Sequence, residues 1–224
     1  TYTQEEASIK ATDKAGNVTY TNSFPSNLVM GTTYQLLKDH SRMRITTPQS
    51  GTGSITLDLN GHTFTSTENS TFDAIVLRTS GITFNIKDNS ANGGGKFIGT
   101  SANSVIGTNA NCKNCTVNIG PKVTIEGCVT VFNSGNTLNV EGTINGGDDF
   151  AIATNGSKTT SGTINIKEGA VLTSNVTAVY LPGKTNVTIS GGEITGATGV
   201  YQKSGTLNIT GGTINGTGAA ADYT

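Results

Sequence analysis

The sequence contains no tryptophan, four prolines and few charged side chains, and each shortage excludes a class of protein. Charged residues make up only 13% of the 224 positions, which excludes a disordered chain rich in lysine and glutamate. The formal net charge is −1 and no basic cluster occurs, so we expect no nucleic-acid partner. Apolar runs stay well below the roughly 18 residues of a membrane span, so we expect no membrane insertion.

A signal peptide is also missing, and the chain begins at Thr1 rather than at methionine. We therefore expect the chain to be part of a longer, exported precursor. No segment shows the apolar period of about 3.6 residues that marks a helix, so we expect little helix. What is abundant is glycine, with 30 residues, in a polar but uncharged mixture with Thr, Asn and Ser. That mixture is typical of short strands joined by tight turns.

Cysteine is scarce, and the three present are Cys112, Cys115 and Cys128. The Cys-Lys-Asn-Cys spacing fits either a redox pair or half of a metal site. A zinc site needs a full tetrahedral set of ligands, however, and the chain has neither a second such pair nor two neighbouring histidines. We therefore interpret the cysteines as structural, either as buried thiols or as one local disulfide that leaves a third thiol over. No cofactor is expected.

A four-residue motif of the type Thr-Leu-Asn-Ile recurs along the chain. Clear copies lie at 83–86, 116–119, 137–140, 163–166 and 206–209, and looser copies at 56–59 and 186–189. Each copy alternates polar and apolar residues, which is typical of a strand with one buried face. Most copies are followed by a turn and a second short apolar segment, then by another turn and a third. Each repeat of 20 to 33 residues therefore holds three short strands.

Three short strands per repeat predict an all-β chain folded as a right-handed parallel β-helix of about seven to eight coils. A propeller blade would need about 40 residues and a tryptophan-containing signature, and a leucine-rich repeat would need helical segments. Residues 1–53 lack the motif; a hairpin is predicted over 7–21, turning at 13–17. We expect 1–53 to form an N-terminal cap and first irregular coil, and 54–224 to form the regular repeats of one continuous domain.

Two early segments point to a family: YQLLKD at 34–39, and SITLDLNGHTFT at 54–65, followed by coils of the TLNITGGTI type. In this order they resemble the pectin-lyase-like β-helix modules found in large exported proteins of Gram-positive, often gut-dwelling, bacteria. The resemblance spans nearly the whole chain and implies a secreted or cell-surface protein. It implies no single activity, because this fold carries lyases, hydrolases, adhesins and inert stalks alike.

The strongest enzyme signal is GGDDFAIATNGS at 146–157, which is similar to the acidic-pair segment of polygalacturonases. Asp148 and Asp149 are the candidate catalytic residues, because glycoside hydrolysis needs one carboxyl group as acid and another as base or nucleophile. The companion motifs Gly-His-Gly and Arg-Ile-Lys are missing. The aligned carboxylate of Asp73 is expected three coils away, at about 14 Å. A solvated turn is therefore the favoured interpretation of the acidic pair.

Two glutamates are the candidate metal ligands. Glu141 and Glu168 follow the first strand of adjacent coils, so we expect them about 5 Å apart, a spacing that suits calcium. Because Lys167 lies beside them in sequence, a pair of solvated glutamates is the favoured alternative.

The outward side of the first strand presents regular ranks of hydroxyl and amide groups. Thr137, Asn139, Thr163 and Asn165 are the candidate ligand-binding residues of this face, which can hydrogen-bond a glycan or order water in the manner of ice-binding solenoids. The competing interpretation is that stacked Thr and Asn only stabilise the sheet.

Aromatic residues add a second candidate surface. Tyr180 and Tyr201 lie at equivalent third-strand positions one coil apart, either as a platform for a sugar or as core. The sequence thus favours a non-catalytic scaffold or adhesin module that binds carbohydrate or another host surface component. The alternative is a carbohydrate-active enzyme, either a glycoside hydrolase or a polysaccharide lyase.

Overall fold

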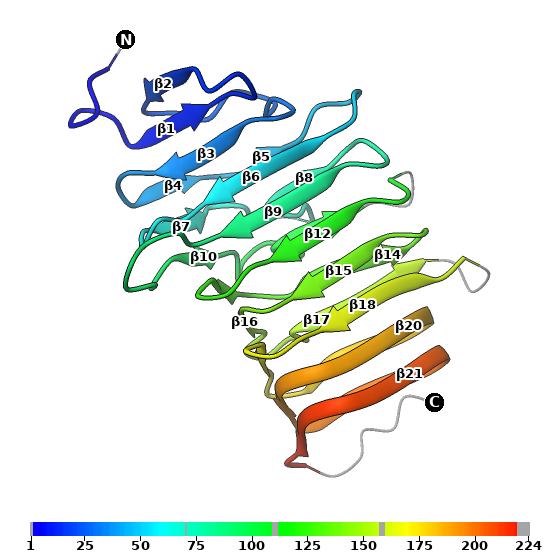
Figure 1. The fold of residues 1–224 in the computed structure, drawn as a ribbon. Helices are drawn as coiled ribbons and strands as arrows, with labels where there is room; N and C mark the ends of the chain where they lie inside the picture. Colours follow the sequence, from blue (N-terminus) through cyan, green and yellow to red (C-terminus); the bar gives the residue numbers. More distant parts are fainter. Residues whose placement is uncertain (1, 70, 109–111, 157–159, 219–224) are drawn as a thin grey trace.

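The computed structural model describes residues 2–69, 71–108, 112–156 and 160–218, and across them the chain forms a parallel β-helix (Figure 1). These residues form 21 strands and no helix, which confirms the predicted all-β class. Strands of the front sheet run in one direction, the chain returns behind them, and successive coils descend from the N-terminal to the C-terminal end. The coil is right-handed, as parallel crossover connections generally are.

Each coil contributes one strand to each of three parallel sheets. The first sheet contains β3 (Thr33–Leu36), β6 (Ser54–Asp58), β9 (Thr83–Lys87), β12 (Thr116–Ile119), β15 (Thr137–Val140) and β18 (Gly162–Ile166). The second contains β4 (His40–Arg42), β7 (Thr63–Ser66), β10 (Lys96–Ile98), β13 (Thr124–Glu126), β16 (Thr143–Asn145) and β19 (Val171–Thr173). The third contains β5 (Ile45–Thr46), β8 (Ile75–Leu77), β11 (Ile106–Thr108), β14 (Val129–Asn133) and β17 (Ile152–Gly156).

The pairing register confirms that the copies from 83–86 to 206–209 occupy equivalent positions. The looser copy at 56–59 is wrong by two residues, because Ser54 pairs with Thr83 and Leu57 with Ile86. Asn118 pairs with Asn85 and Asn139, and Asn139 pairs with Asn165, so the motif stays in phase across coils whose lengths differ. Loops at the corners absorb the length differences, because a slip of one residue would turn every apolar side chain outward.

The last two coils differ from the expected separate short strands. β20 (Thr177–Gly196) and β21 (Thr198–Gly216) run continuously around all three sheets and pair with each other along most of their length. Val179 pairs with Val200 and Ile194 with Ile214, so the two coils are nearly equal in length and their backbones stay in hydrogen-bonding reach at the corners. Register shifts near Leu181 and Ser190 accommodate those corners.

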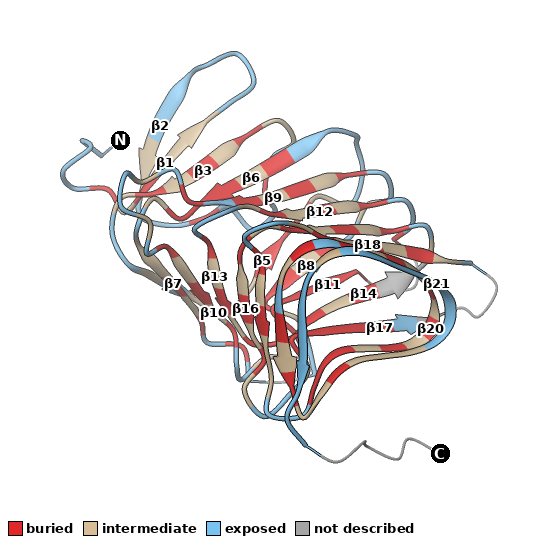
Figure 2. Cartoon of the chain, turned by 60° about the horizontal axis from the view of Figure 1, so that its bottom comes forward, coloured by how far each residue is buried: buried red, intermediate tan, exposed pale blue. Residues whose placement is uncertain are grey.

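Buried positions, red in Figure 2, recur along the strands of successive coils. The aliphatic and aromatic residues among them form the core as a column along the axis. Every second residue of each short strand points inward, and Phe64 stacks on Phe97 within the column at 4.6 Å between ring centroids. Burying one such side chain stabilises a protein by roughly 1.5–3 kcal/mol, which makes the stacking of coils the main source of stability.

The two ends of the column differ. At the N-terminal end β1 (Ile9–Thr12) and β2 (Val18–Thr21) form the predicted antiparallel hairpin, and β1 pairs antiparallel with β3, so the edge of the first coil is covered. At the C-terminal end Leu207, Ile209 and Ile214 occupy inward positions of β21. They are nevertheless 43%, 51% and 37% exposed, because no described strand stacks beyond β21.

Candidate functional site

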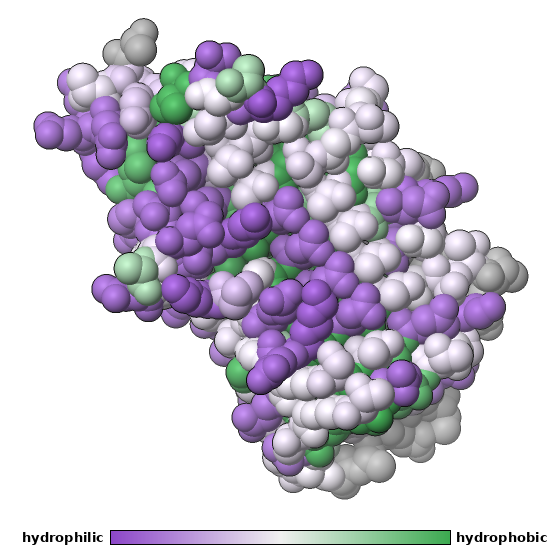
Figure 3. Space-filling view, in the orientation of Figure 1, coloured by the Kyte–Doolittle hydropathy of each residue, from purple (hydrophilic) through white to green (hydrophobic). Residues whose placement is uncertain are grey.

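The amide groups of the first sheet hydrogen-bond each other along the stack. We call Asn85, Asn118, Asn139 and Asn165 the amide ladder. Each Nδ2 donates to the Oδ1 of the residue one coil before, at 2.8 Å for all three Asn–Asn pairs, and Asn85 donates to Thr56. Figure 3 shows this face, with hydrophilic side chains gathered down its middle. The ladder accounts for one donor and one acceptor of Asn139 and for one donor of Asn165, as the stabilising interpretation requires.

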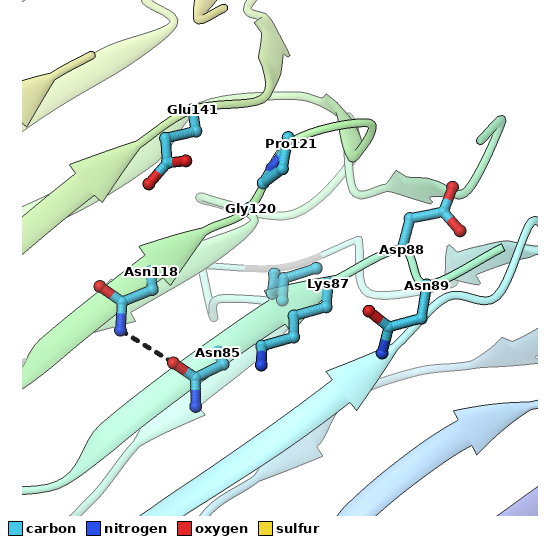
Figure 4. Close-up of a pocket in the computed structure, with 9 residues that line it drawn as sticks. Asn85, Lys87, Asp88, Asn89, Asn118, Gly120, Pro121 and Glu141 are labelled. Atoms are coloured by element: carbon cyan, nitrogen blue, oxygen red, sulfur yellow. Dashed lines mark hydrogen bonds between the residues drawn. The ribbon is translucent and has the colours of Figure 1, made fainter. Parts of the chain in front are cut away.

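A groove of about 380 Å³ opens at the end of this sheet where β9 and β12 finish. We call it the amide groove; it is lined by Asn85, Ile86, Lys87, Asp88, Asn89, Asn118, Gly120, Pro121 and Glu141. In Figure 4 the side chains of Asn85, Lys87 and Asn89 lie on one side of the strand end, while Asp88 points away.

The acidic groups of the amide groove are already engaged. Asp88 is buried, and although burial alone would raise its pKa, hydrogen bonds from Ser90, Gly95 and Gly61 hold the pKa below its usual range. Glu141 Oε1 lies 3.1 Å from Lys167 Nζ. The register pairs Val140 with Ile166, so Lys167 rather than Glu168 stands beside Glu141, and the two glutamates do not occupy equivalent positions.

The third sheet carries a stack of three partly exposed aromatic rings. Phe150 stacks on Tyr180 at 4.5 Å between ring centroids with 14° between the planes, and Tyr180 stacks on Tyr201 at 5.3 Å with 20°. Tyr180 and Tyr201 are Cα partners in adjacent coils, as predicted, and they point outward rather than into the core. We call these three residues the aromatic stack.

Phe150 is the member that the sequence analysis missed. It belongs to the turn before β17, one position in advance of the buried Ala151, and its side chain leans across to reach Tyr180 in the next coil. Its place directly after Asp148 and Asp149 was available in the sequence, but the strand alternation does not extend into turns, so no periodic signal marked it.

A second groove of about 380 Å³ adjoins the aromatic stack. This aromatic groove is lined by Asn103, Cys128, Thr130, Asp149, Phe150, Ala153, Thr154, Asn155, Tyr180 and Pro182. The groove is present because the three preceding coils hold small residues at the outward position that pairs in line with Tyr180. These residues are Ala153, Thr130 and Gly107. Gly107 is covered by Asp73, since a Cβ there would lie within 1.7 Å of the Asp73 carboxylate.

The two candidate catalytic carboxylates have different surroundings. Asp149 is exposed, lines the aromatic groove and accepts a hydrogen bond from the Phe150 amide at 2.7 Å. Asp148 is also exposed but lies outside that lining, and it accepts a hydrogen bond from Asn175 at 2.7 Å. Counting back from the paired strands places Phe150, not Asp149, at the position equivalent to Asp73.

Cys128 lies at the base of the aromatic groove, and burial and the charges of Asp149 and Asp73 affect the pKa of its thiol. Burial raises the pKa of its thiol to about 12, and the negative charges of Asp149 and Asp73 contribute to the rise. Both carboxylates therefore lie close enough to act on one thiol. Asp73 itself accepts hydrogen bonds from Asn103 at 3.0 Å and from Ser104 at 2.6 Å.

Comparison with known proteins identifies no relative: no family model, no curated protein and no solved structure matches the chain. Within the described ranges, no three His, Cys, Asp or Glu side chains come together as metal ligands would. Over the same ranges, no helix has the length and apolar character needed to cross a membrane.

Proposed function

We propose that the chain is a non-catalytic, carbohydrate-binding β-helix module of a secreted or cell-surface protein, and that the aromatic groove is its binding site. The observation that carries the proposal is the partly exposed aromatic stack beside a groove of polar side chains. The resemblance to pectin-lyase-like modules of exported bacterial proteins supports the extracellular setting.

The chemistry of the groove suits a sugar. A pyranose ring offers apolar C–H groups on its face and hydroxyl groups around its edge, so it is bound by an aromatic ring together with hydrogen-bonding groups. Phe150 and Tyr201 stack on the two faces of Tyr180, so a sugar would stack on the face of Phe150 that is turned away from Tyr180. Phe150 is the end ring next to Asp149 and Thr130, which supply a carboxylate and a hydroxyl.

The groove is also rigid and of suitable size. Its residues lie on or next to strands that are paired on both sides, and the rings are held by stacking on one another, so little side-chain entropy is lost on binding. A volume of about 380 Å³ falls in the range of small-molecule sites, roughly 300–1,000 Å³. With Asp149 in the groove and Asp73 nearby, we expect neutral glycans to be preferred over anionic ones.

A glycan-array screen followed by calorimetric titration of the best neutral hit tests the proposal. Phe150→Ala should weaken binding by about 2- to 13-fold, since the loss of one stacking face is worth roughly 0.5–1.5 kcal/mol. Tyr20→Ala, which removes a tyrosine of the N-terminal hairpin, is the matched control and should bind as the unmodified chain does. Equal binding by both variants, or no glycan binding at all, would refute the proposal.

A second candidate function, glycoside hydrolysis, is favoured by one observation: Asp149 lines the aromatic groove, and Asn103 of the same lining donates a hydrogen bond to Asp73. Such chemistry requires at least two carboxyl groups at the substrate, one as acid and the other as base or nucleophile. Release of reducing sugar from the glycan that binds, abolished by Asp149→Asn with binding retained, would establish it. Binding without turnover would leave the non-catalytic proposal in place.

A further inference from the structure

We propose that Cys112 and Cys115 form a reactive dithiol that closes to an intrachain disulfide on reaction with a small disulfide, with Cys115 as the attacking sulfur. The pair lies in the turn between β11 and β12, outside the lining of the aromatic groove, so this inference is independent of glycan binding.

Both thiols are directed to the same place in the preceding coil. The Sγ of Cys112 donates to the carbonyl oxygen of Leu77 at 2.8 Å, and the Sγ of Cys115 donates to that of Thr79 at 3.2 Å. The two sulfurs also hydrogen-bond each other. All three cysteines are free thiols in the structure, so Cys112 and Cys115 form a neighbouring dithiol pair.

A buried asparagine from the next coil holds the backbone of the turn. The Oδ1 of Asn136 accepts from the Cys115 amide at 2.9 Å, and its Nδ2 donates to the Cys112 carbonyl at 3.1 Å. Asn136 is only 1% exposed, so this clamp fixes both cysteines relative to one another. Fixing both ends of a Cys-x-x-Cys turn raises the effective concentration of one sulfur at the other, which favours ring closure over a mixed disulfide.

The surroundings of Cys115 make it the nucleophile. The hydrogen bond from Cys112, with backbone N–H groups of Ile82 and Gly81, outweighs burial and lowers the pKa of Cys115 to about 7. A substantial fraction is therefore thiolate at neutral pH, where an ordinary cysteine is mostly protonated. Both sulfurs are buried, so the exposed residues Lys113 and Asn114 between them must move aside for a small disulfide to reach Cys115.

The reaction balances with a small disulfide such as oxidised glutathione. The Cys115 thiolate attacks one sulfur of the oxidant and displaces a glutathione thiolate, which leaves a mixed disulfide on Cys115. Cys112 loses its proton and attacks Cys115, forming the intrachain S–S bond and releasing a second glutathione. The protein gives up two protons and two electrons, and the oxidant becomes two thiols. An exported protein meets such oxidising conditions.

The position of Lys113 gives a direct test. The reduced, folded chain is incubated with oxidised glutathione, its remaining thiols are alkylated in denaturant, and it is digested with trypsin. Because trypsin cuts after Lys113, a disulfide keeps the two resulting peptides joined, with a mass about 2 Da below their sum as separate thiols. The rate of closure should rise with pH around a midpoint near 7, in step with thiolate formation on Cys115.

Two variants serve as controls. Cys128→Ala removes the buried thiol whose pKa is raised to about 12, and should close the pair at an unchanged rate. Cys112→Ser removes the resolving sulfur, so a stable glutathione adduct should accumulate on Cys115. Two separate, fully alkylated peptides after oxidation of the unmodified chain would overturn the proposal. So would linkage of either cysteine to Cys128 instead.

Discussion

Replacing Asn118 with threonine tests whether the amide ladder stabilises the β-helix. Asn118 donates to Asn85 and accepts from Asn139, both at 2.8 Å, and its side chain is partly buried. Loss of two hydrogen bonds costs roughly 1–3 kcal/mol, since each contributes about 0.5–1.5 kcal/mol net. Threonine recovers a few tenths through its higher strand propensity. We therefore expect Asn118→Thr to lower the free energy of unfolding by about 1–2 kcal/mol.

Urea unfolding followed by circular dichroism measures this effect. With an m value of about 3 kcal/mol/M, the midpoint should fall by roughly 0.5 M. Asn208→Thr is the matched control: it changes the same motif position in β21, where the exposed amide hydrogen-bonds no described residue, and it should shift the midpoint by far less. If the two variants unfold at the same urea concentration, the ladder is not a stabilising device, and its amides are available for a ligand.

Two further predictions concern stability. Gly107→Ala should destabilise the chain by roughly 1–3 kcal/mol through the clash of its Cβ with Asp73. Added to a chain that already carries Asp73→Ala, the same substitution should cost much less in the same urea assay, because the group that its Cβ meets is gone. Hydrogen bonds lower the pKa of Asp88 in the folded state. The ionised side chain therefore adds to the free energy of unfolding above the pKa of an unfolded aspartate, about 3.9, and this contribution is lost as the pH falls below that value. Unfolding midpoints compared at pH 7 and pH 3 should therefore differ less for Asp88→Asn than for the unmodified chain, and an unaltered difference would count against this role.

The fold followed from the sequence because the motif repeats in register. An apolar residue equivalent to Ile164 occurs at the same strand position in the neighbouring coils, as Leu138 and Val187 do. Stacking the coils in register buries all of these side chains together. The continuous strands β20 and β21 could not be predicted, because whether pairing continues round a corner depends on neighbouring coils having equal length, which a motif read locally does not report.

The site was predicted only in part, for a related reason. Tyr180 and Tyr201 lie on strands, so alternation placed them correctly within one sheet and one coil of each other. Phe150 lies in a turn, where the side-chain direction is set by tertiary contacts rather than by strand period. The pairing of Glu141 with Lys167 was likewise missed by one residue, since the last residue of a strand is the least certain point of its register.

The aromatic groove draws its lining from successive coils, with Thr130, Ala153 and Tyr180 paired in one line along the axis. Each step along that line is one strand spacing, about 4.8 Å, and cannot take an intermediate value. Equivalent positions along the axis of the β-helix are therefore separated by whole multiples of this spacing. Adding or removing a whole coil between Asn103 and Tyr180 would lengthen or shorten the ligand that fits the groove by one strand spacing. A change in a corner loop would alter which ligand group is bound at that coil and would leave the spacing between coils unchanged.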